Sequence, residues 1–273
     1  MDMIANKFKQ AMRADMSADG VTYGMWFGLA SNIAAEICAQ SGFDWMLIDA
    51  EHSPLSDKDI LSCLQAVAPY DINPIVRPVS GDKAVLKRLC DVGVQTFLVP
   101  MVDTVAEAET IVSAVRYPVA KGQTGGGTRG LGTSMARAAR WNMAPDYFAH
   151  ANDEMCVILQ IETKAGLKNL KKIAKVEGVD ALFIGPSDLG AALGYPGQPN
   201  HPEVVKIVGQ AIKDIRAAGK PAGVLVVDPE VLKFYVECGV NFIGVGSDCG
   251  VLAKGMARLY ENFASGGAEK GDY

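Results

Sequence analysis

Short apolar runs alternate with longer amphipathic segments along the chain, and this alternation is its clearest pattern. Runs such as ALFI at 181–184 are typical of strands buried on both faces, whereas the segments between them have apolar positions at helical spacing. The pattern predicts strands over 22–29, 45–50, 73–78, 96–102, 155–162, 181–185, 221–227 and 242–247. It predicts helices over 31–41, 57–69, 82–92, 104–116, 164–177, 203–218, 229–238 and 250–264. Eight such strand–helix units predict a closed (β/α)8 TIM barrel.

The residues at the ends of the predicted helices support this count. Glycine, which adopts the left-handed conformation easily, follows five of them, at positions 42, 93, 178, 219 and 239. A doubly wound sheet would also alternate strands and helices, but the number of units and the wide spread of polar strand ends favour the barrel. The chain has 273 residues and no break in composition, so we expect one domain over 1–273.

Two segments fall outside the eight units. Residues 1–20 are amphipathic, contain acids and lack the apolar centre of a signal peptide, so we interpret them as a short surface helix. Residues 119–143 are rich in Gly and have no apolar period. Long loops in compact domains are usually functional or disordered. We expect a mobile lid or interface loop, in which Arg129 could approach an anion, with a plain surface loop as the alternative.

Composition and charge exclude several classes of protein. The net charge is −5 and no cluster of Lys and Arg is present, which argues against a nucleic-acid partner. No apolar stretch is long enough to span a bilayer, so we expect no membrane partner. The six cysteines have no CxxC spacing, and we expect free thiols in a reducing cytoplasm.

Carboxylates stand at the ends of two successive predicted strands. VILQIE ends in Glu162, and the GPSD segment that follows ALFI ends in Asp188. Two carboxylates without an accompanying His or Cys suit a hard divalent ion and leave coordination positions for a 2-oxo acid and water. Capping or salt-bridged acids are the alternative.

The GPSD segment also carries a candidate anion site. Gly185 lets backbone approach a ligand, and Pro186 suits the first turn of a helix. The backbone N–H groups of Ser187 and Asp188 would then point at a carboxylate or phosphate, unless the turn is a plain helix cap. Arg77, which ends NPIVR immediately before a proline, could clamp an oxyanion or form a buried ion pair.

His52 is the best candidate for a general base. It follows the WMLID strand, with Asp49 and Glu51 beside it, and a neutral imidazole oriented by a carboxylate accepts protons near neutral pH. We expect Asp49 to orient the imidazole, and a structural histidine is the alternative. His150 and His201 are interpreted as exposed and structural, respectively.

Together these residues suggest enolate chemistry. A divalent ion would bind the carboxylate and keto oxygen of a 2-oxo acid, Arg77 would stabilise the enolate, and His52 would move the proton. The enolate would attack an aldehyde, or would form as a 4-hydroxy-2-oxo acid breaks. No lysine stands at a comparable strand end, so a Schiff-base mechanism is disfavoured.

In these residues and their spacing the chain resembles the HpcH/HpaI family of class II pyruvate aldolases, from about residue 22 to 264. The strongest stretches are AAEICAQSGFDWMLIDAEHSP, VRPVSGD, FLVPMVDTVAEAE, LQIETKAGL and FIGPSDLGAALGYPG. The resemblance implies a TIM-like barrel and a divalent-metal lyase that cleaves or forms 4-hydroxy-2-oxo acids, with pyruvate as one product.

The resemblance also implies a role for individual residues. His52 matches the family's base, Arg77 its transition-state stabiliser, and Glu162 and Asp188 its metal ligands. Gln160 and Ser187 match positions that contact substrate. Asp91, in LCDVG, matches an aspartate that raises the basicity of the histidine. Because a barrel helix descends from the active rim, Asp91 would need a neighbouring subunit to reach the site.

The family resemblance implies a hexamer built as a trimer of dimers, with swapped C-terminal helices. The apolar stripe of residues 251–263 fits such packing, and fits ordinary barrel closure equally. The TGGG insertion before Thr128 and Arg129 is longer than the family's loop, which leaves the aldehyde side of the site open.

Other functions fit the same residues less well. An oxaloacetate decarboxylase or another enolate-forming synthase would share Glu162, Asp188 and Arg77, a CoA-ester lyase would need an added site, and a non-enzymatic scaffold would need none of them. The sequence does not choose among Mg, Mn and Co, nor among aldehydes, nor the stereochemistry at C4.

Overall fold

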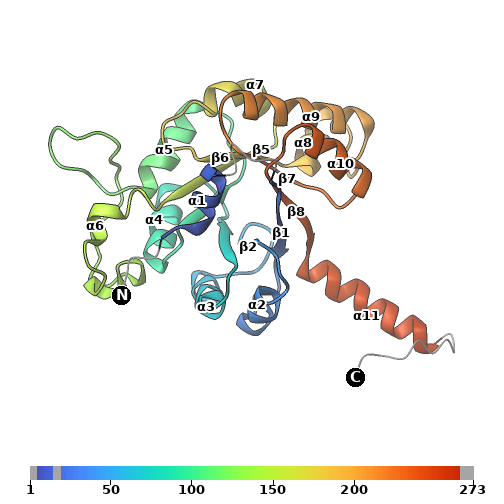
Figure 1. Ribbon diagram of the computed structural model, residues 1–273, viewed down its shortest axis with the longest axis horizontal. Coiled ribbons are helices and arrows are strands. Elements are labelled where there is room, and N and C mark those ends of the chain that lie inside the picture. Colours follow the sequence, from blue (N-terminus) through green and yellow to red (C-terminus); the bar gives the residue numbers. More distant parts are fainter. Residues whose placement is uncertain (1–4, 15–19, 265–273) are drawn as a thin grey trace.

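Eight parallel strands close into a barrel in chain order, β1 to β8, with helices around it (Figure 1). The computed structural model describes residues 5–14 and 20–264, so residues 1–4, 15–19 and 265–273 of the predicted domain lie outside the described residues. The strands are β1 Thr22–Phe27, β2 Trp45–Asp49, β3 Asn73–Arg77, β4 Thr96–Val99, β5 Cys156–Ile161, β6 Ala181–Ile184, β7 Ala222–Leu225 and β8 Phe242–Ser247. The predicted TIM barrel is confirmed.

The helices follow the predicted units with two additions, α6 (Tyr147–His150) and α8 (Pro186–Leu193). They are α1 Lys7–Ala14, α2 Asn32–Ala39, α3 Asp57–Val67, α4 Lys83–Val92, α5 Val105–Val115, α6 Tyr147–His150, α7 Lys164–Ile173, α8 Pro186–Leu193, α9 Pro202–Ala217, α10 Pro229–Glu237 and α11 Asp248–Ala264. Between β6 and β7 the structure has two helices, α8 and α9, where the sequence pattern predicts one long helix. No helix of residues 5–14 and 20–264 is long and apolar enough to cross a membrane.

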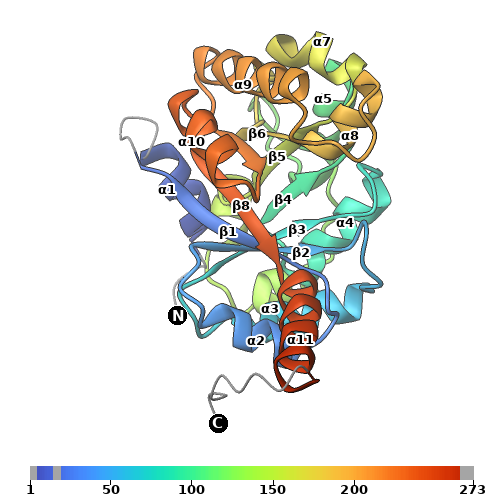
Figure 2. The same ribbon diagram turned by 90° about the vertical axis from the view of Figure 1, so that its right-hand side faces the viewer.

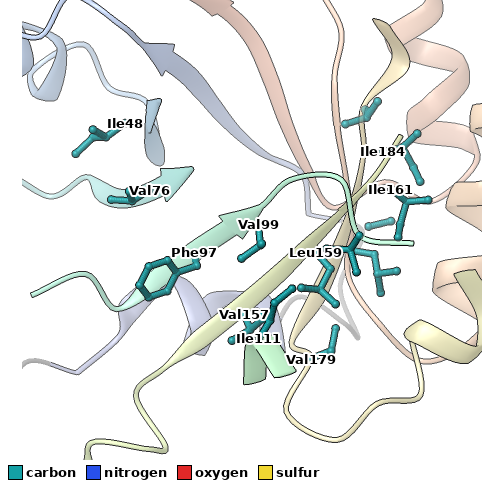
Figure 3. Close-up of a cluster of buried hydrophobic side chains, with 14 of the residues drawn as sticks. Ile48, Val76, Phe97, Val99, Ile111, Val157, Leu159, Ile161, Val179 and Ile184 are labelled. Atoms are coloured by element: carbon teal, nitrogen blue, oxygen red, sulfur yellow. The ribbon is translucent and has the colours of Figure 1, made fainter. Parts of the chain in front are cut away.

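The outward faces of the strands pack against the surrounding helices. Figure 3 shows Val99, Leu159 and Ile184 from neighbouring strands, with Ile111 of α5 beside Val157. Each of these side chains is at most 3% exposed. Because both faces of every strand are covered, each strand is a nearly continuous apolar run in the sequence. This is why the strand positions could be predicted well from the sequence.

The barrel interior is filled by large aromatic side chains. Each of Trp26, Trp45, Phe183 and Phe242 contacts two of the others, with ring centroids 5.6–6.2 Å apart. Gly24 is required beside them, because a Cβ atom there would overlap the Trp45 ring. The interior is therefore packed, and a ligand can reach only its ends.

The N-terminal helix α1 covers one end of the barrel, with Lys7 and Gln10 exposed on its outer side. Phe8 and Met12 are each 3% exposed and belong to the interior cluster, and Lys9 is buried with its Nζ 3.3 Å from Asp180. The short amphipathic segment has its apolar side on the strands' N-terminal ends, which a periodicity argument alone does not distinguish from a side that rests on the surface.

The C-terminal helix α11 projects away from the barrel (Figures 1 and 2). Asp248 at its start accepts hydrogen bonds from the backbone N–H groups of Gly28 and Leu29 and thereby fixes its origin to β1. Beyond that point its apolar side chains are exposed: Val251, Leu252, Met256, Leu259, Tyr260 and Phe263. Ordinary barrel closure by this stripe is therefore excluded within one chain.

Candidate active site

The predicted site residues come from the C-terminal ends of four strands. Asp49 and Arg77 end β2 and β3, Gln160 lies near the end of β5, and Glu162 directly follows it. The loop after β2 carries Glu51 and His52, and α8 after β6 begins with the PSD sequence. Because the strands are parallel, all of these residues face one rim of the barrel.

A cavity of about 490 Å³ opens at this rim. Its lining contains most of the predicted site: His52, Arg77, Gln160, Gly185, Pro186, Ser187 and Asp188. Sequence reasoning missed the walls that come from the other strands: Trp26, Phe183, Leu225, Val227, Gly246 and Ser247. Most of these residues are apolar or small and lie at or near the ends of apolar runs, so only their place at a strand end could have indicated them.

Arg77 is held between two carboxylates. Its Nε and Nη2 atoms donate to Oδ1 and Oδ2 of Asp49 at 2.9 and 2.6 Å, and its Nη1 lies 3.0 Å from Oε2 of Glu51. The side chain is buried, 5.8 Å from the Trp26 ring. Burial alone would lower the pKa of Arg77, but the hydrogen bond and charge of Asp49, and the charges of Glu51 and Glu162, raise it. The guanidinium is therefore a fixed positive charge in the cavity wall.

Asp49 is used differently from the sequence-based interpretation. Its carboxylate binds Arg77 and accepts from the backbone N–H groups of Glu51 and His52. The carboxylate nearest to the imidazole is instead Glu51, whose Oε2 lies 3.7 Å from Nε2 of His52. A correction follows: Asp49 fixes Arg77 and the backbone of the loop after β2, and Glu51 is the acid beside the imidazole.

Glu162 is buried directly behind Gln160 and Gly185, two residues of the cavity lining. Its Oε1 accepts from the backbone N–H of Met101 at 2.9 Å, and its Oε2 accepts from the Nε2 of Gln160. Burial raises the pKa of Glu162, the two hydrogen bonds lower it, and the charges of Asp188 and Glu51 raise it further. Oε1 of Gln160 is buried and has no hydrogen-bond partner among the described residues.

Gly185 allows the start of α8 to approach Glu162. A Cβ atom at this position would lie 2.5 Å from Oε2 of Glu162 and 3.0 Å from Nε2 of Gln160, so glycine is required there. Pro186 is the first residue of the helix, as the sequence predicts, and Ser187 and Asp188 are exposed in its first turn. The backbone N–H groups of this turn are suited to a substrate carboxylate.

The oxygen atoms around Glu162 fit a hard divalent ion. Glu162 and Asp188 repel each other, and Gln160 adds an unsatisfied amide oxygen. Residues 5–14 and 20–264 contain no group of three or more His, Cys, Asp or Glu that could hold a metal. A site with two protein carboxylates needs oxygen atoms from substrate and water to complete its shell, which suits a catalytic ion rather than a structural one.

Asp91 and the Gly-rich loop lie at the opposite end of the barrel. The loop joins α5 to β5, and Asp91 is near the C-terminal end of α4, so both lie near the N-terminal ends of the strands. Asp91 pairs with the buried Arg129 at 3.0 Å, and the Arg129 guanidinium stacks on Tyr117 at 4.2 Å. A lid over the cavity of the same chain is therefore excluded, and the role of Asp91 stays a prediction that needs a second subunit.

The cysteines are free thiols, as predicted, and four of the six are buried. Burial is the main cause that raises the pKa of Cys63 to about 11 and of Cys90 to about 12. Neither thiol is therefore a nucleophile at neutral pH.

A sequence profile described as HpcH/HpaI aldolase/citrate lyase matches residues 22–255. The chain belongs to this family. It is 47% identical to a hydroxypyruvate/pyruvate aldolase of Pseudomonas aeruginosa, over 97% of this chain and 96% of that protein. It is 48% identical to a 4-hydroxy-2-oxo-heptane-1,7-dioate aldolase of Shigella sonnei, over 95% of each.

The solved structures agree. A HpcH/HpaI aldolase/citrate lyase family protein of Burkholderia cenocepacia superimposes with a TM-score of 0.88 at 33% identity, covering 95% of this chain and 100% of that one. The predicted family is confirmed, and the aldolase names of these relatives support the predicted enzyme class, an aldehyde-lyase.

Proposed function

We propose that this aldolase cleaves a 4-hydroxy-2-oxo acid to pyruvate and an aldehyde, and runs the reverse addition, at the site formed by His52, Arg77, Glu162 and Asp188. The observation that carries the proposal is the convergence of a fixed guanidinium, an exposed imidazole and the Asp188 carboxylate on one cavity of about 490 Å³. The second carboxylate, Glu162, lies directly behind the lining residues Gln160 and Gly185. A divalent ion (Mg, Mn or Co) held by Glu162 and Asp188 would supply a Lewis acid for the 2-oxo oxygen.

The protein's own side chains then account for the proton and the charge. His52 takes the proton of the C4 hydroxyl, the C3–C4 bond breaks, and its electron pair passes to C3 and the 2-oxo oxygen as the aldehyde leaves. Arg77 lines the cavity, and its guanidinium donates toward the developing negative charge. Return of the proton to C3 gives pyruvate.

The remaining residues hold the substrate. The N–H groups of Ser187 and Asp188 and the amide of Gln160 bind the carboxylate end of the 2-oxo acid, and Gly185 with Pro186 brings that backbone close. Asp49 keeps Arg77 in place. Leu225 and Val227 line the cavity and supply apolar surface, so we assign the aldehyde side to them. The names of the two relatives make pyruvate and hydroxypyruvate the first nucleophiles to test, with four-carbon semialdehydes among the acceptors.

We also propose a homo-oligomer, a hexamer built as a trimer of dimers, in a reducing cytoplasm. The exposed apolar stripe of α11 supports exchange of this helix between subunits, because a contiguous apolar surface of this kind normally marks an interface. The six free thiols support a reducing compartment.

The first experiment follows loss of the pyruvate methyl signal by NMR in D2O, with and without Mg or Mn. It needs no choice of aldehyde. We expect metal-dependent exchange in the natural protein and none in Glu162→Ala. Absence of exchange with every metal would contradict pyruvate as the nucleophile and would favour decarboxylation of oxaloacetate, which release of carbon dioxide measures.

A further inference from the structure

Glu51 is the one acid that contacts both the proposed base and the proposed stabiliser of the enolate, among the residues that the structure describes. Its Oε2 atom lies 3.0 Å from Nη1 of Arg77 and 3.7 Å from Nε2 of His52. Its side chain is 17% exposed, whereas that of His52 is 66% exposed. The imidazole is therefore the exposed partner, and the carboxylate is the buried one.

Asp49 cannot take over this task, because its two oxygens are occupied. They accept from Nε and Nη2 of Arg77 and from two backbone N–H groups of the loop after β2. Oε2 of Glu51 differs, since among the described residues it is buried and has no aligned hydrogen bond. It forms an ion pair with Arg77, lies within ion-pair distance of His52, and can accept a hydrogen bond from the imidazole N–H when that ring turns toward it.

We propose that Glu51 is a positioning residue, whose carboxylate holds the imidazole of His52 at a set place relative to the guanidinium of Arg77. This inference rests on the proposed function. Proton transfer and charge stabilisation must act on one substrate, and a misplacement of about 1 Å can cost a factor of roughly 100 in rate. A bridge between the two groups fixes their separation, which neither strand end alone does, because His52 lies on a loop.

The test is a double-mutant cycle on pyruvate proton exchange with Glu51→Gln and His52→Asn. Glutamine keeps the shape of the side chain and removes its charge. We expect Glu51→Gln to lower kcat roughly ten- to a hundredfold, as loss of a supporting carboxylate typically does. In the His52→Asn background we expect a further loss below about threefold, because Glu51 then has no imidazole to place.

A purely structural role predicts a different result. If Glu51→Gln only lowered the fraction of folded enzyme, the same factor would appear in both backgrounds, and that outcome would overturn the proposal. Activity of Glu51→Gln within twofold of the natural protein would overturn it too. Glu230→Gln, which removes an exposed acid paired with Lys233, is the matched control and should change nothing.

A second measurement is independent of catalysis. The chain has three histidines, so the imidazole Cε1–H signals of the metal-free protein can be assigned with His52→Asn. We expect the His52 signal to move in Glu51→Gln and to stay in Glu230→Gln, and an unmoved signal would contradict the contact. Natural protein that shows no exchange with any metal would instead contradict the proposed function, while the NMR shift would still decide the contact.

Discussion

Two buried arginines, each paired with an aspartate, lie at opposite ends of the barrel and differ in their surroundings. Arg77 is 6% exposed and binds Asp49 at the C-terminal rim, and Arg129 is 2% exposed and binds Asp91 near the N-terminal ends of the strands. Both line cavities of similar size, about 490 and 450 Å³. Burial, ion pairing and cavity volume therefore do not by themselves indicate a catalytic role for either arginine.

The surroundings of each pair make the difference. Arg77 shares its cavity with His52 and Asp188 and carries a second acid, Glu51, on its free nitrogen. Arg129 stacks on Tyr117 and fastens the 119–143 loop to α4. A fixed positive charge can assist catalysis where groups able to move protons or bind a metal ion surround it. Without such groups, as at Arg129, the charge holds segments of the chain together.

The largest expected effect is at the rim. Glu162→Gln keeps the volume of the side chain and removes one of two carboxylates proposed to hold the ion. We expect proton exchange of pyruvate to fall by roughly a thousandfold or more, because stabilisation of the developing charge usually contributes most to such catalysis. Initial rates over a range of Mn concentrations measure it, and rates that recover fully at high Mn would show weakened binding alone.

Arg77→Met is the next largest change. It removes the N–H groups that we propose to stabilise the enolate oxygen, and loss of one such donor costs about a hundred- to a thousandfold in kcat. Rates are to be normalised to folded protein, since Asp49 is left buried without its partner. If exchange per folded molecule matched that of the natural protein, the proposed catalytic role of Arg77, and with it the difference from Arg129, would be contradicted.

Arg129→Met tests the other end through stability. Removing the guanidinium leaves Asp91 unpaired and Tyr117 without its stacked cation. Because Asp91 is 43% exposed and water can solvate it, we expect about 2 kcal/mol, below the cost of breaking a fully buried pair. Thermal unfolding should show a Tm lower by roughly 5 °C. An unchanged Tm would mean that the loop is not held by this residue.

Asp91→Asn sharpens the comparison, because the family resemblance gives this residue a catalytic role. We expect exchange to fall about tenfold if a neighbouring subunit brings Asp91 to His52, the usual size of an effect that acts through another residue. Measuring the rate across a dilution series, alongside the assembly state, links any loss to the oligomer. Turnover equal to that of the natural protein would reject the carry-over.

The smallest effect concerns the stability of the metal-free protein. Burial raises the pKa of Glu162, so the folded state keeps its proton to higher pH than the unfolded chain does. The contribution of Glu162 to the free energy of unfolding therefore falls as pH rises from about 4.3, the ordinary glutamate pKa, through the raised pKa of the folded state. Glu162→Gln does not titrate and should be about 1 kcal/mol more stable at pH 7, a Tm gain of roughly 3 °C. The gain should vanish at pH 4, and a lower Tm at pH 7 would contradict it.

Much of the fold was predictable because both faces of each strand are buried. ALFI and VILQI read as strands without tertiary information, and their parallel arrangement brings Glu162 and Gly185 to one rim. The burial of α1 was not predictable, since an amphipathic segment has the same pattern on a surface as over the end of a barrel. The same holds for the α11 stripe, which fits barrel closure and subunit exchange equally.

Within the site, positions were predictable and partners were not. The sequence placed Asp49, Glu51 and His52 together, but three carboxylate or imidazole groups within four residues can pair in several ways. The choice depends on Arg77, which comes from the next strand and takes Asp49 by two hydrogen bonds. Asp91 shows the opposite limit, because the catalytic role that the family resemblance implies for it needs a second subunit, which the sequence of one chain does not place.

The seal that α1 forms has a consequence for the order in which the molecule is made. Phe8 packs edge-on against Phe242 of β8 with ring centroids 5.8 Å apart, so α1 leaves the ribosome long before the strand that it packs against. Such long-range closure makes folding slow, and until β8 arrives Phe8 and Met12 expose their apolar surface to other nascent chains. A chain that terminates before residue 242 would carry that exposed surface permanently and would be a substrate for chaperones and proteases.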